Sequence, residues 1–439
     1  MRIALRVRSA TIALVLLVGL VGVGGGPAEA GHVKQSPDRY MCQTNGRVND
    51  ILYVGRRVYF VGSFTQVRSR GSSRVRNHAA ACNVRTGGIL RWNPNLDRRA
   101  FRLARAPRGG PSAGDIYIGG EFNSVRGKIH RKIAKVDPVS GKARKWNPVV
   151  RGKVRALAVS RNGNRVFVGG PFLKVNGVTR VRVAALHGAD RELVSGWNPR
   201  VERPAQGQGS PPSPGTCPPR CAPNVTALEV SRDGTQVYIG RTFGLVDGAP
   251  RNSIAAVTQR SGALLRWYPH RAGSPGATKG VYSGGSFNQV YDIEALGNHV
   301  FLCGNYFALA GQASPNVGAA FASNGARDFG WRATTDGAVN ACAVDEAHLF
   351  IGGHFRKAGR YPASSNGQWR NHVGAVAGSN GALHNWDPGA NSTPGLYAVG
   401  TSISRVGIGG DFTKTGGGCR PPPVPCSSNK QGFAQYSPT

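Results

Sequence analysis

The sequence predicts an all-β protein, a seven-bladed β-propeller with four antiparallel strands in each blade. One observation is a motif that occurs seven times, in which an alternating apolar strand leads into glycine and then an aromatic residue. Successive aromatic residues of the motif are 58, 50, 71, 63, 49 and 57 positions apart. A second observation is a tryptophan that closes most copies. Such self-similarity is typical of repeat architectures, in which recurring residues are structural, so function is expected where the copies differ.

The seven motifs mark the units in chain order. They are VYFVGSF at Val58–Phe64, IYIGGEF at Ile116–Phe122, VFVGGPF at Val166–Phe172, VYIGRTF at Val237–Phe243, VFLCGNY at Val300–Tyr306, LFIGGHF at Leu349–Phe355 and VGIGGDF at Val406–Phe412. Each is expected to form the second strand of its unit.

The third copy shows how one unit is built. Its apolar segments are VRALAV (Val154–Val159), RVFVGG (Arg165–Gly170), VRVAAL (Val181–Leu186) and LVSGWNP (Leu193–Pro199). Apolar residues alternate as in strands, and Asn162-Gly163 supplies the positive-φ residues of a tight hairpin turn. No stretch predicts a long helix. Four antiparallel strands per unit match a propeller blade, because closure into a ring leaves only short, protected edges.

Large aromatic residues recur at the end of the units. They are Trp92, Trp146, Trp197, Trp267, Trp331 and Trp386, four of them within a Trp-Asn-Pro or Trp-Asp-Pro sequence. Because they recur at equivalent positions, we expect them to fill the wedge between neighbouring sheets and not to stack on a ligand.

The last unit lacks its fourth strand, since the chain ends after Gly432–Tyr436. Residues Val33–Met41 are expected to supply that strand and to join the two ends of the chain. Alignment of the first and third copies places Tyr40 at the position of Trp146. The prediction is therefore a closed ring, which buries strand edges that would otherwise promote aggregation.

The stretch WDPGANSTPGLYAVGTSISRVGIGGDFTKTGG at Trp386–Gly417 resembles the bacterial delta-60 repeat propellers, and the fungal cortical polarity-marker propellers are similar in the same motif. The resemblance covers nearly all of residues 40–436. It departs at Arg241, which replaces the second glycine of the motif, and at Cys303, which replaces the first. It implies a β-propeller and no reaction, because the motif residues are scaffold and this fold hosts many functions.

Residues 1–30 are predicted to be a secretory signal peptide, with an arginine-containing start, an apolar stretch at Ala10–Gly24 and a small-residue end at Ala28-Glu29-Ala30. Residues 31–439 are then a single propeller domain. No later segment has the roughly 20 consecutive apolar residues that a transmembrane helix requires. The mature chain is expected to be secreted, with no transmembrane segment.

Eight cysteines, an even number, fit an oxidising compartment. Two pairs are local in sequence, Cys217 with Cys221 and Cys419 with Cys426. The CPPRC spacing of the first could indicate zinc, but zinc needs a second matched ligand pair, so a small disulfide ring is favoured and no metal or cofactor is expected. Cys303 and Cys342 fall on early strands of consecutive units and could form a cross-blade disulfide. Cys42 with Cys82 follows by elimination.

The positive charge is unevenly distributed. Residues 31–201 contain 34 Lys/Arg against 8 Asp/Glu, a net charge of +26, whereas residues 202–439 contain 19 against 12, a net charge of +7. Such a field attracts polyanions and weakens with salt, although arginines spread over solvated strands would give the same composition. The densest basic run, Arg98–Arg108, lacks the regular interleaving of aromatic residues that nucleic-acid binding favours, so nucleic acid is not the expected partner.

Several residues are candidates for ligand binding. Insertions concentrate in the loops of one face, here called the upper face, and Trp369 is the one tryptophan outside the repeat register, beside Arg370 and His372. Trp369 could stack on a sugar ring or a partner, or pack within its loop. Asp50 and Asp292 occupy first-strand positions where most copies have alanine. They could hold an ion or buried water, because a buried aspartate needs a partner.

A ring of residues between glycine and the aromatic residue is also expected: Ser63, Glu121, Pro171, Thr242, Asn305, His354 and Asp411. Glu121, His354 and Asp411 could form an acid/base pair or a metal site, or simply line a variable loop entrance. The favoured hypothesis is a noncatalytic exported module that binds an anionic surface polymer or a protein partner. The alternatives are an exported carbohydrate-active hydrolase or lyase that uses these three residues, and a structural assembly unit.

Overall fold

The computed structural model describes residues 33–202, 223–270, 280–282, 288–361, 367–417 and 426–438. These residues form 39 β-strands and no helix, so the predicted all-β class is confirmed. The part of the chain described here contains no helix long and apolar enough to cross a membrane. The predicted signal peptide and the pair Cys217 and Cys221 lie outside the described residues.

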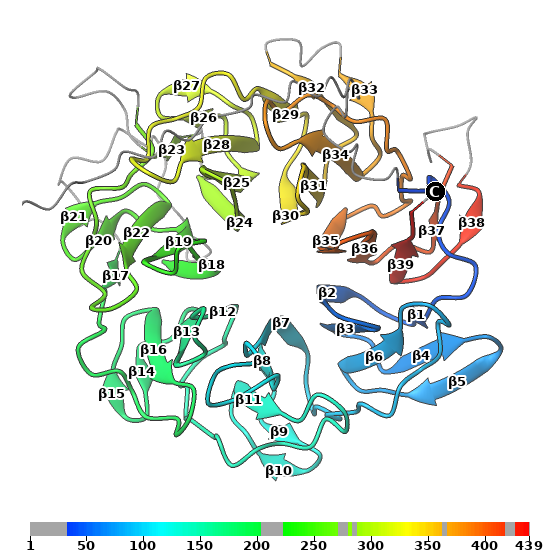
Figure 1. Cartoon of the computed structure of the whole chain (residues 1–439), viewed down its shortest axis with the longest axis horizontal. Coiled ribbons are helices and arrows are strands. Elements are labelled where there is room, and N and C mark those ends of the chain that lie inside the picture. Colours follow the sequence, from blue (N-terminus) through cyan, green and yellow to red (C-terminus); the bar gives the residue numbers. More distant parts are fainter. Residues whose placement is uncertain are drawn as a thin grey trace, which may run out of the picture.

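Seven three-stranded antiparallel sheets form the inner part of the described chain, and in each the strand of the repeated motif lies in the middle. They are β2 (Val48–Val54), β3 (Arg57–Gly62) and β6 (Ala79–Asn83); β7 (Ala100–Arg105), β8 (Ile116–Gly120) and β11 (Ile133–Val136); β12 (Ala156–Val159), β13 (Arg165–Gly169) and β16 (Val183–His187); β18 (Asn224–Val230), β19 (Gln236–Thr242) and β22 (Ile254–Thr258); β24 (Gln289–Leu296), β25 (His299–Asn305) and β28 (Val317–Phe321); β30 (Val339–Val344), β31 (His348–Gly353) and β34 (Val373–Ala377); β35 (Leu396–Ser402), β36 (Arg405–Gly410) and β39 (Phe433–Tyr436). Figure 1 shows them following one another in chain order around a common centre, with their first strands innermost.

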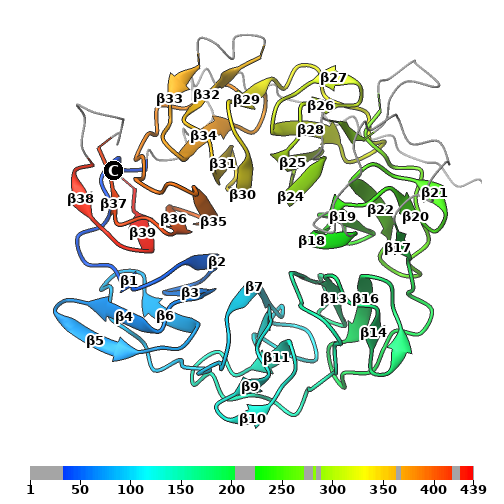
Figure 2. The same cartoon turned by 180° about the vertical axis from the view of Figure 1, so that it is seen from behind.

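Seven smaller sheets lie outside the inner ones, as both faces of the molecule show (Figures 1 and 2). They are β1 (Gln43–Thr44), β4 (Gln66–Ser69) and β5 (Ser72–Val75); β9 (Ser124–Val125) and β10 (Lys128–Ile129); β14 (Lys174–Val175) and β15 (Val178–Thr179); β17 (Val201–Glu202), β20 (Leu245–Val246) and β21 (Ala249–Pro250); β23 (Val281–Tyr282), β26 (Ala308–Leu309) and β27 (Gln312–Ala313); β29 (Ala333–Thr335), β32 (Lys357–Arg360) and β33 (Gln368–Trp369); β37 (Lys414–Thr415) and β38 (Ser428–Asn429). The loop between the second and third inner strands supplies most of them.

The expected four strands per unit are not all formed, because the inner sheets have three strands each. The segment expected as the fourth strand makes a single bridge instead, as between Leu186 and Leu193 in the third unit. The chain then turns away at Trp197, whose main-chain N–H donates to the carbonyl of Val194. The segment leaves the sheet because its tryptophan points into the space beside the next sheet.

The recurring tryptophans are buried between sheets, as the sequence predicted, and none of the six is more than 5% exposed. Each indole Nε1–H donates to a main-chain carbonyl of the following unit. The acceptors are Asp137 for Trp92, His187 for Trp146, Thr258 for Trp197, Phe321 for Trp267 and Ala377 for Trp331, at 2.8–3.1 Å. The tryptophans therefore pack the sheets together and also satisfy their own polar group.

The two ends of the described chain meet at the last inner sheet. Val33 forms an antiparallel bridge with Pro438, the N–H of Asp38 donates to the carbonyl of Gln435, and Trp386 Nε1 donates to the carbonyl of Lys34 at 3.0 Å. Residues 33–41 thus lie beside the last inner sheet as expected, but they form a single bridge there and not the expected fourth strand.

The expectation for Tyr40 was wrong in one respect. Its ring does not fill a wedge: Tyr40 is 48% exposed, and the guanidinium groups of Arg39 and Arg70 lie against the ring. The next two residues, Met41 and Cys42, are buried instead. The phenol carries a polar group and gains cation–π contacts at the surface, so burial of the ring is not required.

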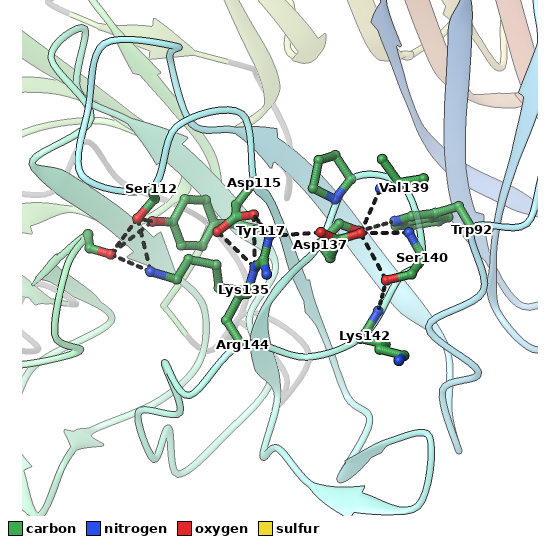
Figure 3. A network of polar contacts seen from close by, with 12 residues as sticks. Trp92, Ser112, Asp115, Tyr117, Lys135, Asp137, Val139, Ser140, Lys142 and Arg144 are labelled. Atoms are coloured by element: carbon green, nitrogen blue, oxygen red, sulfur yellow. Dashed lines mark hydrogen bonds and ion pairs between the residues drawn. The ribbon is translucent and has the colours of Figure 1, made fainter.

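A polar network joins three consecutive inner sheets at the second unit (Figure 3). Lys135 is 6% exposed and donates to Ser112 Oγ at 3.0 Å and to the carbonyl of Gly188 at 2.8 Å. Arg144 pairs with Asp115 and Asp137, and the carbonyl of Asp137 accepts from Trp92. Burial lowers the pKa of Lys135. Polar bonds thus supplement the aromatic wedge between these sheets.

Two predicted disulfides are confirmed, Cys42–Cys82 and Cys303–Cys342. The second joins β25 to β30, across two neighbouring inner sheets. Cys426 is also disulfide-bonded, while Cys419 lies outside the described residues.

Candidate ligand-binding site

The first strands of the inner sheets carry a β-bulge at one place in the repeat. In six of the seven inner sheets described, the pairing of the first and second strands shifts by one residue, as between Val48 and Asp50 in β2. The extra residues of these bulges, which have no partner on the second strand, are Asn49, Phe101, Thr226, Tyr291, Asn340 and Tyr397. Arg155 is at the same position of the repeat in the third unit. A bulge re-aims a side chain, and bulges occur often beside functional sites. These seven residues are called the bulge ring below.

All seven bulge-ring residues line one cavity of about 630 Å³, here called the mouth cavity. Most of its lining residues lie at or beside the starts of the first strands, which are the innermost strands in Figure 1. Ser63, His354 and Asp411, from the loop positions that the sequence predicted to form a ring, line it as well. One residue from each of seven units therefore faces a shared concave surface.

Positive charge is confined to one half of the mouth cavity. Five arginines line it: Arg47, Arg99, Arg102, Arg155 and Arg241. They come from the first four units, whereas the units of β24, β30 and β35 contribute no arginine or lysine to the lining. The uneven charge seen along the sequence is thus repeated at the centre of the molecule.

Two of the five arginines are neutralised by carboxylates. Arg47 Nε donates to Asp411 Oδ2 at 2.7 Å, and Arg99 Nε donates to Glu121 Oε1 at 2.5 Å. Lys153 also pairs with Glu121, at 2.9 Å. Burial alone would raise the pKa of Glu121, but the hydrogen bonds from Lys153 and Arg99 lower it below its usual value.

Arg102, Arg155 and Arg241 have no close carboxylate partner among the described residues. The nearest ion pair is Arg102 with Asp292, at 4.0 Å. Arg155 and Arg241 make no side-chain hydrogen bond in the described chain and lie instead against aromatic rings: Arg155 is 4.9 Å from the Phe101 centroid and Arg241 4.3 Å from that of Tyr291. Burial is the main reason that the pKa of Arg241 falls to about 10, and the charges of Arg155 and Arg102 act in the same direction.

Arg241 replaces a glycine of the repeated motif. At the equivalent Gly62, Gly170, Gly304 and Gly353, a Cβ atom would collide with the main-chain carbonyl of the preceding first strand. In the fourth unit the backbone avoids this contact by adopting φ = 150° at Arg241, a conformation that residues with a side chain rarely take. The strain is kept for a side chain that lines the mouth cavity.

A narrower cavity of about 220 Å³ lies along the same first strands, and Arg102 lines both cavities. Asp50 and Asp292 face this cavity, and each accepts a hydrogen bond from the first strand of the next unit. Asp50 Oδ2 accepts from the N–H of Leu103 at 2.7 Å, and Asp292 Oδ2 accepts from the N–H of Cys342 at 3.2 Å. The two aspartates therefore join neighbouring sheets. Burial raises the pKa of Asp50 to about 6, against the opposing charge of Arg102.

Glu229 and Glu294 line the same narrow cavity. Burial raises the pKa of Glu229 to about 8. Burial and then the charge of Glu229 raise the pKa of Glu294 well above its usual value. Sequence reasoning missed both residues, because each is a glutamate at a position where the other five copies of the repeat have none.

The structure brings the three catalytic candidates to the same region. His354 and Asp411 line the mouth cavity, and Glu121 contacts its lining residue Arg99. Both carboxylates are held in ion pairs with basic side chains. The described residues contain no group of three or more His, Cys, Asp or Glu side chains placed to hold a metal.

Trp369 and Arg370 lie elsewhere, in and just after β33 of an outer sheet, whereas the ring of His372 stacks 6.2 Å from that of His354, which lines the mouth cavity. Trp369 is partly exposed with Lys357 Nζ 5.5 Å from its ring centroid, and Arg370 is buried, with bonds to the carbonyls of Trp369 and His384. Arg76, Arg180 and Arg251 each donate to two main-chain carbonyls in the same way, so the arrangement of Arg370 is a repeated scaffold feature.

His372 is buried. Burial, followed by the charge of His354, lowers its pKa to about 4.

The bulge ring was missed by sequence reasoning, although a signal for it exists. Aligned on the repeat, its position reads Asn, Phe, Arg, Thr, Tyr, Asn and Tyr, while the residue before it is Val, Ala or Leu in every copy. When one position varies between the copies of a repeat and its neighbour is apolar in every copy, the variable position is where the units can differ in function. The bulge that turns these residues toward the centre is not visible in the sequence.

No protein-family model and no curated protein matches the chain. Among solved structures, the chain is similar to that of the computationally designed Ika8 protein, with 12% sequence identity and a TM-score of 0.46 over 92% of this chain and 100% of the designed one.

Proposed function

We propose that the chain is an exported, noncatalytic seven-bladed β-propeller of the delta-60 repeat type that binds an anionic surface polymer at its mouth cavity. The ring-like order of the seven inner sheets and the contacts between the two chain ends support the propeller interpretation. Disulfide bonds support export, because they persist in oxidising compartments.

The observation that carries the binding proposal is the set of five arginines around one cavity, with only two paired to a carboxylate closer than 4 Å. A concave, partly desolvated surface with excess positive charge concentrates anions and strengthens each charge-assisted hydrogen bond to them. The net charge of +26 on residues 31–201 adds a longer-range attraction for anions.

Binding is favoured over hydrolysis by the state of the two carboxylates. A general acid needs a raised pKa, whereas the pKa of Glu121 is lowered by its basic partners. Asp411 accepts two bonds from Arg47, so its role is to orient that guanidinium. The hydrolase interpretation would require both ion pairs to open.

The test is retention of the mature chain on immobilised heparin as a function of salt. Electrostatic binding predicts that the logarithm of the affinity falls linearly with the logarithm of salt concentration. Replacing Arg98 and Arg151 by glutamine should lower the eluting salt concentration. The matched replacement of Arg232 and Arg260, also exposed, should change it little. Retention that is independent of salt would refute the proposal.

A further inference from the structure

The strongest unexplained feature of the mouth cavity is a group of three arginines, of which Arg155 and Arg241 have no ion-pair partner among the described residues and Arg102 lies 4.0 Å from Asp292. They come from three consecutive units, and the charges of Arg155 and Arg102 lower the pKa of Arg241 after the effect of burial. Cations that are desolvated beside one another are costly unless an anion joins them. Because Asp292 already faces Arg102, about two positive charges are left for an anion, which matches the roughly two negative charges of a phosphate monoester.

In the opposite half of the cavity, Arg47 and Asp411 offset each other as an ion pair, and the Arg47 guanidinium lies 3.9 Å from the Tyr397 ring centroid. The other side chains there are hydrogen-bonding groups, those of Asn340, Tyr397 and His354, together with Pro394. Asn340 Nδ2 donates to the carbonyl of Leu396 at 2.9 Å, so its Oδ1 is the acceptor that remains. Amides, phenols and imidazoles bind hydroxyl groups, and the volume of about 630 Å³ is within the range of small-ligand sites.

We propose that the mouth cavity binds a phosphorylated sugar at the end of a polymer, with the phosphate against Arg102, Arg155 and Arg241 and the sugar hydroxyls against Asn340 and Tyr397. This inference rests on the proposed function and names its ligand. The two halves of the cavity act together, because the cationic half holds the phosphate and the neutral half distinguishes a sugar phosphate from a free anion.

Arg241 provides the sharpest variant. Glycine occupies its position in the other six copies, so Arg241→Gly restores the scaffold residue and removes the unusual φ of 150°. The free energy of unfolding should be unchanged or higher, whereas the affinity should fall. Strain retained for binding predicts this opposition of stability and affinity.

The control is Arg126→Gly. Arg126 also has a positive φ, of 51°, and is exposed in the turn between β9 and β10. The substitution removes the same charge and also replaces a side chain at a positive φ, in the milder left-handed helical region, but Arg126 does not line the mouth cavity.

The experiment is calorimetric titration of the mature chain with D-glucose 6-phosphate, inorganic phosphate, D-glucuronate and D-glucose at one ionic strength. Glucose 6-phosphate should bind at least tenfold more tightly than each of the others. Arg241→Gly and Arg155→Gln should each weaken it tenfold or more, and Arg126→Gly less than twofold. Equal binding of inorganic phosphate would overturn the sugar half of the proposal, and equal or tighter binding of glucuronate would overturn the phosphate half. Absence of binding to any probe, or unchanged affinity in Arg241→Gly, would overturn the site.

The inference and the proposed function can fail separately. Salt-sensitive retention on heparin without binding of glucose 6-phosphate would reject the phosphate site and leave the polyanion-binding function standing. Retention independent of salt would reject that function, whatever the small probes do.

Discussion

At the scale of single residues, the same type of side chain has different roles according to what surrounds it. Trp197 is completely buried, packs 5.1 Å from the ring of Phe167 and donates to the carbonyl of Thr258. Trp369, which is outside the repeat register, is partly exposed beside Lys357. The same side chain is a wedge between sheets in one place and a surface residue in the other.

This contrast predicts the cost of removing each ring. Trp197→Ala should lower the free energy of unfolding by about 3–5 kcal/mol, because it leaves a large cavity and an unpaired carbonyl. Trp369→Ala should cost less than about 1 kcal/mol. Urea unfolding followed by circular dichroism measures both. Similar losses in the two variants would contradict the wedge role.

At the scale of elements, the first strand of each inner sheet combines a bulge with a row of central side chains. The bulge presents one residue per unit to the mouth cavity, and the residues that follow line the narrower cavity. Asp50 and Asp292 there bond the backbone of the next first strand. Four carboxyl groups, those of Asp50, Glu229, Asp292 and Glu294, therefore share a space that also holds the Arg102 side chain.

These carboxyl groups make stability depend on pH. The pKa of Glu229 is about 8 in the folded chain and is ordinarily 4.5, so the folded state binds more protons than the unfolded state between these values. Stability should therefore fall as pH rises from about 4.5 to 8 and then level off. Glu229→Gln should flatten this decline.

The difference in stability between Glu229→Gln and the parent chain has an expected sign at each pH. Glu229→Gln should be more stable than the parent chain at pH 8.5, by on the order of 1 kcal/mol or more, and close to it at pH 5. Thermal unfolding across this pH range tests the prediction. Glu192→Gln, in an exposed turn, serves as the control, and a parallel decline in Glu229→Gln and the parent chain would count against the role of Glu229.

At the scale of the whole molecule, residues separated by almost the entire chain meet. Asp38 Oδ2 accepts from Gln435 Nε2 and from Ser437 Oγ, both at 2.7 Å, and Lys430 Nζ donates to the carbonyl of Arg39 at 2.9 Å. These bonds fasten the N-terminal segment to β39. Without them the last sheet would present an open edge.

Asp38→Ala should therefore weaken the junction of the two ends. We expect a loss of about 1–3 kcal/mol in the free energy of unfolding, because the buried amide of Gln435 loses an ionised acceptor. We also expect more aggregation on heating, since an exposed edge can pair with another chain. Asp190→Ala, in an exposed turn, is the control, and unfolding curves with light scattering measure both effects. Identical behaviour of the two variants would show that the junction contributes little.

Much of the architecture follows from local pattern alone. Alternation within the seven motifs predicted the strands, recurrence of tryptophan predicted buried wedges, and the absent fourth strand after Tyr436 predicted the meeting of the chain ends. The pair Cys303–Cys342 followed from position in the repeat, and Cys42–Cys82 then followed by elimination. Such features can be read from the sequence because each is repeated, and repetition makes a weak local preference recognisable.

The candidate site was only partly predictable, because its members are single residues from separate units. Asp50, Asp292, His354 and Asp411 were singled out and do face the central cavities, but the bonds of Asp50 to Leu103 and of Asp411 to Arg47 depend on neighbours far away in sequence. The exposed ring of Tyr40 and the three-stranded inner sheets also differ from the sequence pattern.

The sequence by itself determined the all-β class, the seven repeated units and the excess of positive charge. Only the tertiary structure decided which of the 53 basic residues after the predicted signal peptide line one cavity, since Arg102, Arg155 and Arg241 come from three separate sheets whose first strands surround a shared centre. The physical reason is that backbone alternation is a local property, whereas the convergence of charges requires the sheets to be placed beside one another.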